Sequence, residues 1–127
     1  MKYLLDTHVV LWSALEPHKL SDAAKSILLD PYAPKYVSIV SAWEVALKLG
    51  THKLTIDGGL VEFFRMTDEN GFLSLGVERE YISLLNTLPL IHHDPFDRML
   101  IATARAEDLI LITIDENIRK YDVPRIW

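Results

Sequence analysis

The stretch Lys2-Tyr-Leu-Leu-Asp-Thr-His8 opens the chain with a short apolar run, an acidic residue and then a helix-like pattern. A similar junction ends the strongest strand pattern, Leu111-Ile-Thr-Ile-Asp115. Strand-like and helix-like runs alternate between these two stretches. This alternation predicts a parallel sheet with right-handed crossovers, and hence a three-layer α/β/α fold.

Strands are expected where short β-branched and apolar runs lie between turn residues: 2–5, 36–39, 72–75, 109–114 and 125–127. Helices are expected over 9–15, 20–29, 41–49, 60–68, 77–88, 95–107 and 117–121. No internal repeat, linker or low-complexity run interrupts the series. At 127 residues, the chain is expected to be one domain, 1–127.

Composition excludes several classes of site. The chain has no cysteine, which rules out disulfides, a thiol nucleophile and zinc–thiolate centres, and fits a reducing cytoplasm. No apolar run approaches the roughly 20 residues that span a bilayer, and Asp6 and His8 interrupt any signal-peptide pattern. The net charge of −5 excludes a broad basic nucleic-acid surface, so such a contact would need a local basic patch or a bound metal.

Four acidic residues lie at junctions between strand-like and helix-like runs: Asp6, Glu44, Asp97 and Asp115. The carboxyl ends of parallel strands face one crevice, so these carboxylates could meet there. Such a cluster repels itself unless a cation or a proton neutralises it. Oxygen ligands favour a hard cation, Mg²⁺ or Mn²⁺, and hydrolysis of a phosphodiester is chemistry that such a site performs.

Each acid also has a purely structural alternative. Asp6 and Asp115 could cap the helices that follow them, and Ser41 with Glu44 fits the capping box S-x-x-E. Asp97 lies in the first turn of the helix that opens at Pro95, where its alternative is to interact with the helix dipole. Asp94 is expected to cap that helix, although it could instead be an outer acid of the site.

Other polar and aromatic residues carry weaker signals. His92 and His93 are expected to be loop residues, because no serine, threonine or cysteine is singled out as a nucleophile beside them. Trp12 and Trp43 are expected in the core. His8 lies next to Asp6 and could contact a phosphate. The basic residues near the mouth of the expected crevice are Lys48, His52, Lys53 and Arg98. Taken alone, each of them is expected to be a solvated surface charge.

Several motifs together resemble the PIN domain, and within it the VapC-like toxins of prokaryotic type II toxin–antitoxin pairs. They are Leu4-Leu-Asp-Thr-His8, Ser41-Ala-Trp-Glu-Val-Ala-Leu-Lys48, Leu54, His93-Asp-Pro-Phe-Asp-Arg-Met-Leu-Ile-Ala-Thr-Ala104 and Leu111-Ile-Thr-Ile-Asp115. The resemblance covers essentially all 127 residues. The Asp-Pro-Phe-Asp-Arg block resembles one VapC-like subgroup.

The resemblance implies an α/β/α fold around a parallel sheet of four or five strands, and RNA cleavage that depends on Mg²⁺ or Mn²⁺. Asp6, Glu44 and Asp97 match the core acids, and Asp115 matches a fourth, more variable position. Thr113 matches a threonine often found beside that acid, and Asp94 belongs to the subgroup motif. The residues left as possible outer-shell or substrate contacts are Asp94, Thr113, His8, Lys48 and Arg98.

The resemblance also implies a homodimer in the prokaryotic cytoplasm and a small antitoxin with a DNA-binding domain, whose tail blocks the acidic groove. Two other functions compete with it. An aspartyl-phosphate phosphatase usually has its second acid where His8 stands, and an inert binding module would not need four acids. Transfer, ribosomal and messenger RNA all remain open as targets.

Overall fold

Five parallel strands form a single sheet in the computed structural model, which describes residues 1–127. The strands are β1 (Tyr3–Leu5), β2 (Lys35–Ser38), β3 (Leu73–Leu75), β4 (Ile110–Ile112) and β5 (Arg125–Ile126). Their order across the sheet is β3-β2-β1-β4-β5. The expected parallel sheet is confirmed, and all five expected strands belong to it.

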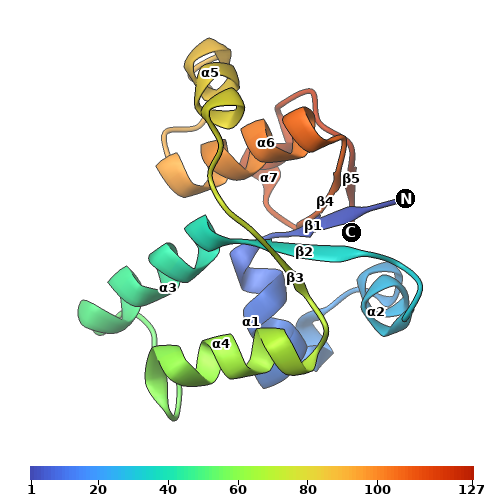
Figure 1. Cartoon of the computed structure of the whole chain (residues 1–127), viewed down its shortest axis with the longest axis vertical. Coiled ribbons are helices and arrows are strands. Elements are labelled where there is room, and N and C mark those ends of the chain that lie inside the picture. Colours follow the sequence, from blue (N-terminus) through green and yellow to red (C-terminus); the bar gives the residue numbers. More distant parts are fainter.

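Helices cover both faces of the sheet. They are α1 (Thr7–Leu15), the 3₁₀ turn η1 (Pro17–Lys19), α2 (Asp22–Leu29), α3 (Ile39–Gly50), α4 (Gly59–Glu69), α5 (Arg79–Thr87), α6 (Pro95–Glu107) and α7 (Glu116–Arg119). In Figure 1, α1 to α4 lie below the sheet and α5 to α7 lie above it. The expected three-layer α/β/α arrangement is therefore confirmed. None of these helices is long and apolar enough to cross a membrane.

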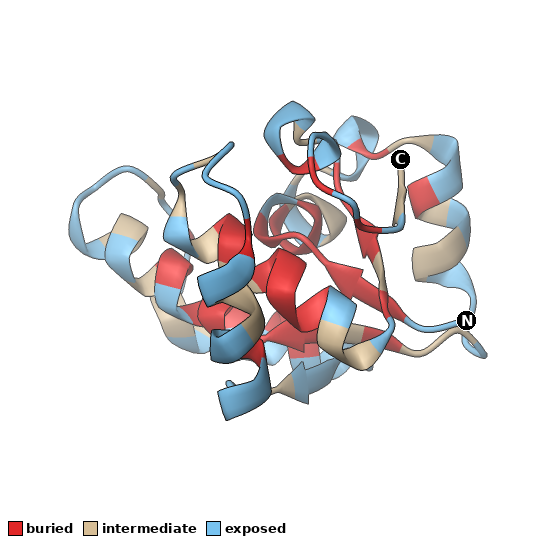
Figure 2. Ribbon diagram, turned by 90° about the horizontal axis from the view of Figure 1, so that it is seen from above, coloured by how far each residue is buried: buried red, intermediate tan, exposed pale blue.

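The two faces of the sheet bury separate apolar clusters. Side chains alternate along a strand, so Tyr3 and Leu5 of β1 join the cluster beneath α1 to α4, whereas Leu4 joins the cluster beneath α6 and α7. Leu111 of β4 lies beside Leu4 and is also fully buried. Figure 2 shows buried residues along the strands and the inward helix faces, with exposed residues outside.

Helix α3 begins two residues earlier than expected. Ser38 is its N-cap, with an Oγ that accepts a hydrogen bond from the Val40 amide at 3.1 Å. Ser41 is therefore inside the helix, and the expected capping box of Ser41 with Glu44 is wrong. Apolar Ile39 extended the strand pattern in the sequence, because a short apolar run does not distinguish a strand end from a helix start.

The expectation that Trp43 belongs to the core is also wrong. Trp43 is 59% exposed, because Ala42 and Val45 take the core-facing positions of α3. Its ring packs edge-on against Phe96, with 5.0 Å between ring centroids. Trp12 is half-buried and packs against the core, as expected.

The strand order reverses direction beside β1. The chain moves outward from β1 to β2 and β3, and then returns to place β4 and β5 on the other side of β1. In open parallel sheets, the crevice for a ligand lies at the carboxyl ends of the strands that flank such a reversal. Asp6 directly follows β1 and Thr113 directly follows β4, so both stand at this point.

Arg98 differs most from its expected role. It is buried on α6 and forms no ion pair with a carboxylate, instead of lying solvated at the mouth. Its guanidinium donates to the carbonyl oxygens of Pro89 at 2.9 Å and Leu85 at 3.3 Å, and to Tyr121 Oη at 3.0 Å. Arg98 therefore fixes the connection between α5 and α6.

We expect Arg98→Met to lower the free energy of unfolding by about 2–3 kcal/mol, because several buried acceptors lose a charged donor. Urea unfolding of both proteins measures the difference. Arg119→Met is the matched control, since Arg119 makes only an exposed pair with Glu116 at 3.5 Å and its loss should leave the midpoint close to wild type. Equal midpoints for the two variants would show that the Arg98 contacts contribute little.

Candidate active site at the carboxyl ends of the strands

Asp6 occupies the N-cap position of α1 but does not cap it with its side chain. The carboxylate is buried, with 4% of the residue exposed, and Oδ2 accepts a hydrogen bond from Thr113 Oγ1 at 2.7 Å. The capping alternative therefore does not explain Asp6. Its side chain reaches across the sheet toward β4, and this contact joins two residues that are 107 positions apart in the sequence.

Glu44 is a buried carboxylate on α3 with half of its acceptor capacity unused. Its Oε2 pairs with Lys48 Nζ at 2.9 Å, one helical turn further on. Its Oε1 is buried without any hydrogen-bond partner, and no other buried side-chain oxygen or nitrogen in the chain shares this state. An unpaired buried acceptor is costly, and a cation beside Glu44 would remove that cost.

Asp97 lies in the first turn of α6 and faces a histidine that the sequence did not single out. Its Oδ2 is 2.8 Å from His92 Nε2. Asp94 caps α6, as expected, with Oδ1 accepting from the amides of Phe96 at 2.8 Å and Asp97 at 3.0 Å. His92, Asp94 and Asp97 offer ligand atoms that all lie within 4.8 Å of one another.

Asp115 caps helix α7, which was the structural alternative for this residue. It is also linked to the site by a hydrogen bond with Thr113. Its Oδ1 accepts from the Asn117 amide at 2.7 Å at the start of α7. Its own amide donates to Thr113 Oγ1 at 3.0 Å. The Thr113 hydroxyl thus donates to Asp6 and accepts from Asp115, so one buried side chain sets the positions of both acids.

The pKa values of two carboxyls show how the acids affect one another. Burial raises the pKa of Asp97 to about 7; the His92 hydrogen bond opposes this rise, while the charges of Asp6, Asp94 and Asp115 add to it. Burial likewise raises the pKa of Asp6, against the Thr113 hydrogen bond and the charge of His8, and Asp115 and Glu44 raise it further. Charge interactions therefore link Asp6 with Glu44, Asp97 and Asp115, while Asp97 alone of the four predicted acids belongs to the set of ligand atoms that lie within 4.8 Å of one another.

The basic residues and histidines that were expected near the acids differ in where their side chains lie. His8 is exposed on α1 and its charge favours ionised Asp6. Lys48 is held by Glu44, whereas Arg98 is directed away from the acids into the α5–α6 connection. Lys53, His52 and His93 are exposed.

Sequence reasoning missed two residues besides His92. Buried Thr7 donates from Oγ1 to Ser41 Oγ at 2.8 Å, which fixes α1 against α3 between Asp6 and Glu44. Two hydroxyls 34 positions apart carry no sequence pattern that would pair them. His92 lies in a loop beside His93, as expected, and its position five residues before Asp97 was the signal for its contact with that acid.

The chain resembles known proteins in sequence and in fold. The chain is 28% identical, over 98% of its length and 97% of the relative's, to Ribonuclease VapC22 of Mycobacterium tuberculosis. VapBC2 from Rickettsia felis, solved bound to a DNA fragment from its promoter, superposes with a TM-score of 0.76 at 15% identity, covering 100% of this chain and 99% of that one. FitAcB from Neisseria gonorrhoeae superposes with a TM-score of 0.64 at 20% identity, covering 100% and 97%.

These structural similarities concern the fold, since both solved structures share few identical residues with this chain. The family comparison is more specific and runs almost from end to end. Residues 3–124 match the PIN domain, a span that holds strands β1 to β4 and all the candidate site residues and ends just before β5. The chain therefore belongs to the PIN domain family.

Proposed function

We propose that this protein is an endoribonuclease that hydrolyses RNA phosphodiester bonds with Mg²⁺ or Mn²⁺ and serves as the toxin of a toxin–antitoxin pair. The observation that carries the proposal is the unpartnered, buried Glu44 Oε1 beside carboxyls whose pKa values are raised. A buried acidic group of this kind is costly unless it binds a cation. The similarity to Ribonuclease VapC22 supports the reaction.

The residues present fit a hard divalent cation. Asp6, Glu44, Asp97 and Asp115 would hold it directly or through water, and oxygen ligands of this kind suit Mg²⁺ and Mn²⁺. When bound, such a cation makes a water molecule nucleophilic near neutral pH and offsets negative charge on the phosphate.

The chain's own groups prepare the site for that cation. Thr113 fixes Asp6 by its hydroxyl, and the Thr7–Ser41 hydrogen bond fixes the helix that carries Glu44. The Asp97 carboxyl retains a proton up to about pH 7 in the absence of metal, so cation binding must displace this proton. Lys48 offers a partly exposed ammonium beside Glu44, from which it could also reach a substrate phosphate.

The competing functions have less support. An aspartyl-phosphate phosphatase would use a second acid two residues after Asp6, but exposed His8 occupies that position. An inert module would have no reason to keep an unsatisfied Glu44 in its interior.

Several solved relatives are VapBC complexes, including DNA-bound VapBC from Salmonella typhimurium, and they support an antitoxin with a DNA-binding domain as the partner.

An exposed apolar groove supports the homodimer. It has a volume of about 350 Å³ and is lined by Ile39, Val40, Trp43, Val77, Leu85, Pro95 and Met99. Trp43 is the largest exposed side chain in this groove. We propose that a second copy of the chain covers it. Helix α3 supplies three of the seven lining residues and the second half of the chain supplies the other four, so this surface lies only partly on the helices of the first half, where the dimer surface was expected.

Metal binding should be measurable without an RNA substrate. We expect Mg²⁺ or Mn²⁺ to raise the melting temperature of the wild type by mass action, and EDTA to reverse the effect. Glu44→Gln should show a smaller rise, because an amide oxygen is a weaker ligand than a carboxylate. Asp122→Asn changes a fully exposed acid and should behave as wild type; an undiminished rise in Glu44→Gln would remove Glu44 from the site.

Asp97→Asn should abolish RNA cleavage at saturating Mg²⁺ or Mn²⁺ while the fold persists. If Asp97 acted only in the first turn of α6, asparagine would serve nearly as well. Cleavage of a labelled RNA, measured beside a thermal melt, separates these outcomes. Retained cleavage would contradict the assignment of Asp97.

The same variant should alter the pH dependence of stability in metal-free buffer. The Asp97 carboxyl has a pKa of 3.8 when unperturbed, and burial raises its pKa to about 7 in the folded protein. Between these values the folded state keeps a proton that the unfolded state has lost, so the free energy of unfolding should fall as pH rises from about 4 to about 7. Asp97→Asn should show a shallower fall in urea titrations at several pH values; identical slopes would contradict the raised pKa.

Trp43→Lys should convert the proposed dimer to a monomer, because it places a charge on the apolar groove. Light scattering at micromolar concentration measures the change. Leu29→Lys, at an 82% exposed position on α2, is the control and should remain dimeric. A wild type that is already monomeric at these concentrations would end the dimer proposal.

A further inference from the structure

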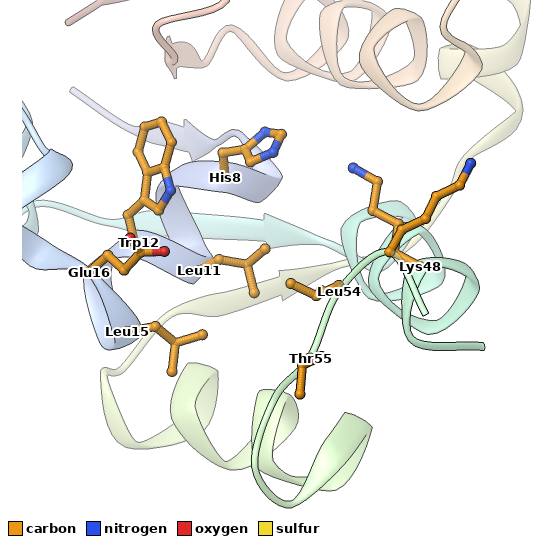
Figure 3. Close-up of a pocket in the computed structure, with 9 residues that line it drawn as sticks. His8, Leu11, Trp12, Leu15, Glu16, Lys48, Leu54 and Thr55 are labelled. Carbon is orange, nitrogen blue, oxygen red and sulfur yellow. The ribbon is translucent and has the colours of Figure 1, made fainter. Parts of the chain in front are cut away.

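A pocket of about 390 Å³ opens between α1 and the connection from α3 to α4. Figure 3 shows His8 and Trp12 of α1 on one side and Lys48 on the other, with Leu11 and Leu54 between them. Lys53 also lines the pocket. The pocket therefore combines an aromatic wall, an apolar floor and a basic side.

The pocket is locally basic in an acidic chain. Lys48, Lys53 and His8 line it, and its only acid, Glu16, is paired with Lys19 at 2.8 Å, as Lys48 is with Glu44 at 2.9 Å. Lys53 has no ion-pair partner. Since the whole chain carries a net charge of −5, this concentration of basic groups favours an anionic ligand at this place.

Aromatic rings form the wall opposite the lysines. The Trp12 ring lies 5.7 Å from the His8 ring and 6.0 Å from the Trp127 ring, measured between centroids. These neighbours and the core hold the half-buried indole in place. A fixed aromatic surface beside basic groups is the arrangement on which unpaired nucleobases stack.

Two of the residues that line the pocket connect it to the acids. Lys48 lines the pocket and also pairs with Glu44 at 2.9 Å. His8 lines it too, two residues after Asp6. An RNA strand with one phosphate at the acids could therefore place a neighbouring nucleotide in this pocket.

We propose that this pocket binds one unpaired nucleotide of the RNA strand next to the phosphate that is cleaved. Trp12 packs against the base, Leu11 and Leu54 contact its edge, and Lys48 and Lys53 neutralise the adjoining phosphates. A base in a duplex is not free to enter, so the subsite selects single-stranded RNA or loops. The inference rests on the proposed nuclease function and adds to it a subsite for one base.

The test measures binding in the Asp97→Asn background, so that RNA is bound without being cut. A fluorescent single-stranded RNA oligonucleotide is titrated and its anisotropy is followed. Trp12→Leu should weaken binding about five-fold or more, the usual effect of removing one stacking surface. Lys53→Gln should weaken binding and reduce the slope of log affinity against log salt by about 0.7.

Matched controls lie far from the pocket. Lys2→Gln changes an exposed lysine at the amino end of β1, and Tyr32→Leu changes an aromatic residue that is 92% exposed. Both should bind the oligonucleotide as the Asp97→Asn parent does. A duplex RNA of the same sequence should bind more weakly than the single strand and should be insensitive to Trp12→Leu.

The outcomes separate the subsite from the nuclease proposal. Unchanged affinity and salt slope in Lys53→Gln, which alters an exposed side chain and should leave the fold intact, together with unchanged affinity in Trp12→Leu, would overturn the subsite. If these variants instead lose affinity only for a co-expressed antitoxin, the pocket is a protein-docking surface and the inference is wrong. A wild type that binds RNA but does not cut it with Mg²⁺ or Mn²⁺ would refute the nuclease function alone.

Discussion

The site depends on holding like charges together away from water. Asp6, Glu44 and Asp97 are all buried; burial raises the pKa of Asp6 and of Asp97, and the neighbouring carboxylates add to both rises. Lys48 and Thr113 relieve part of this cost for Glu44 and Asp6. The remaining repulsion is relieved by a proton on Asp97 when no metal is bound. A bound divalent cation would relieve it in place of that proton.

The sheet topology makes this gathering possible. Because β1 and β4 are neighbours, a hydroxyl after β4 reaches a carboxylate after β1 across the central pair of strands. Helix α6 brings its first turn to the same edge, where its dipole favours the charged form of Asp97 by up to about 1 kcal/mol. That contribution is small beside the burial that raises the pKa of Asp97, so the helix moderates the repulsion without removing it.

Local patterns in the sequence predicted the strands, the parallel sheet and the acids, because alternation, caps and junction positions are features of neighbouring residues. They did not predict the contacts made between distant segments. Arg98 looked like a surface charge because its acceptors are backbone carbonyls, which every residue has. Trp43 was predicted in the core from its size, but its position on α3 leaves it largely exposed. His92 reaches Asp97 from a loop that Arg98 holds by a hydrogen bond to the His92 carbonyl oxygen.

Net charge further limits how this protein can bind a polyanion. With a charge of −5, it cannot rely on many lysine–phosphate contacts; in the proposed function, affinity for RNA would come from a cation at the acids, from Lys48 and Lys53, and from a stacking surface. If the proposed cation binds, it would offset the repulsion between the carboxylates and a phosphate. We therefore expect RNA binding and metal binding to be positively coupled, because the cation attracts the phosphate and the phosphate adds negative charge that attracts the cation.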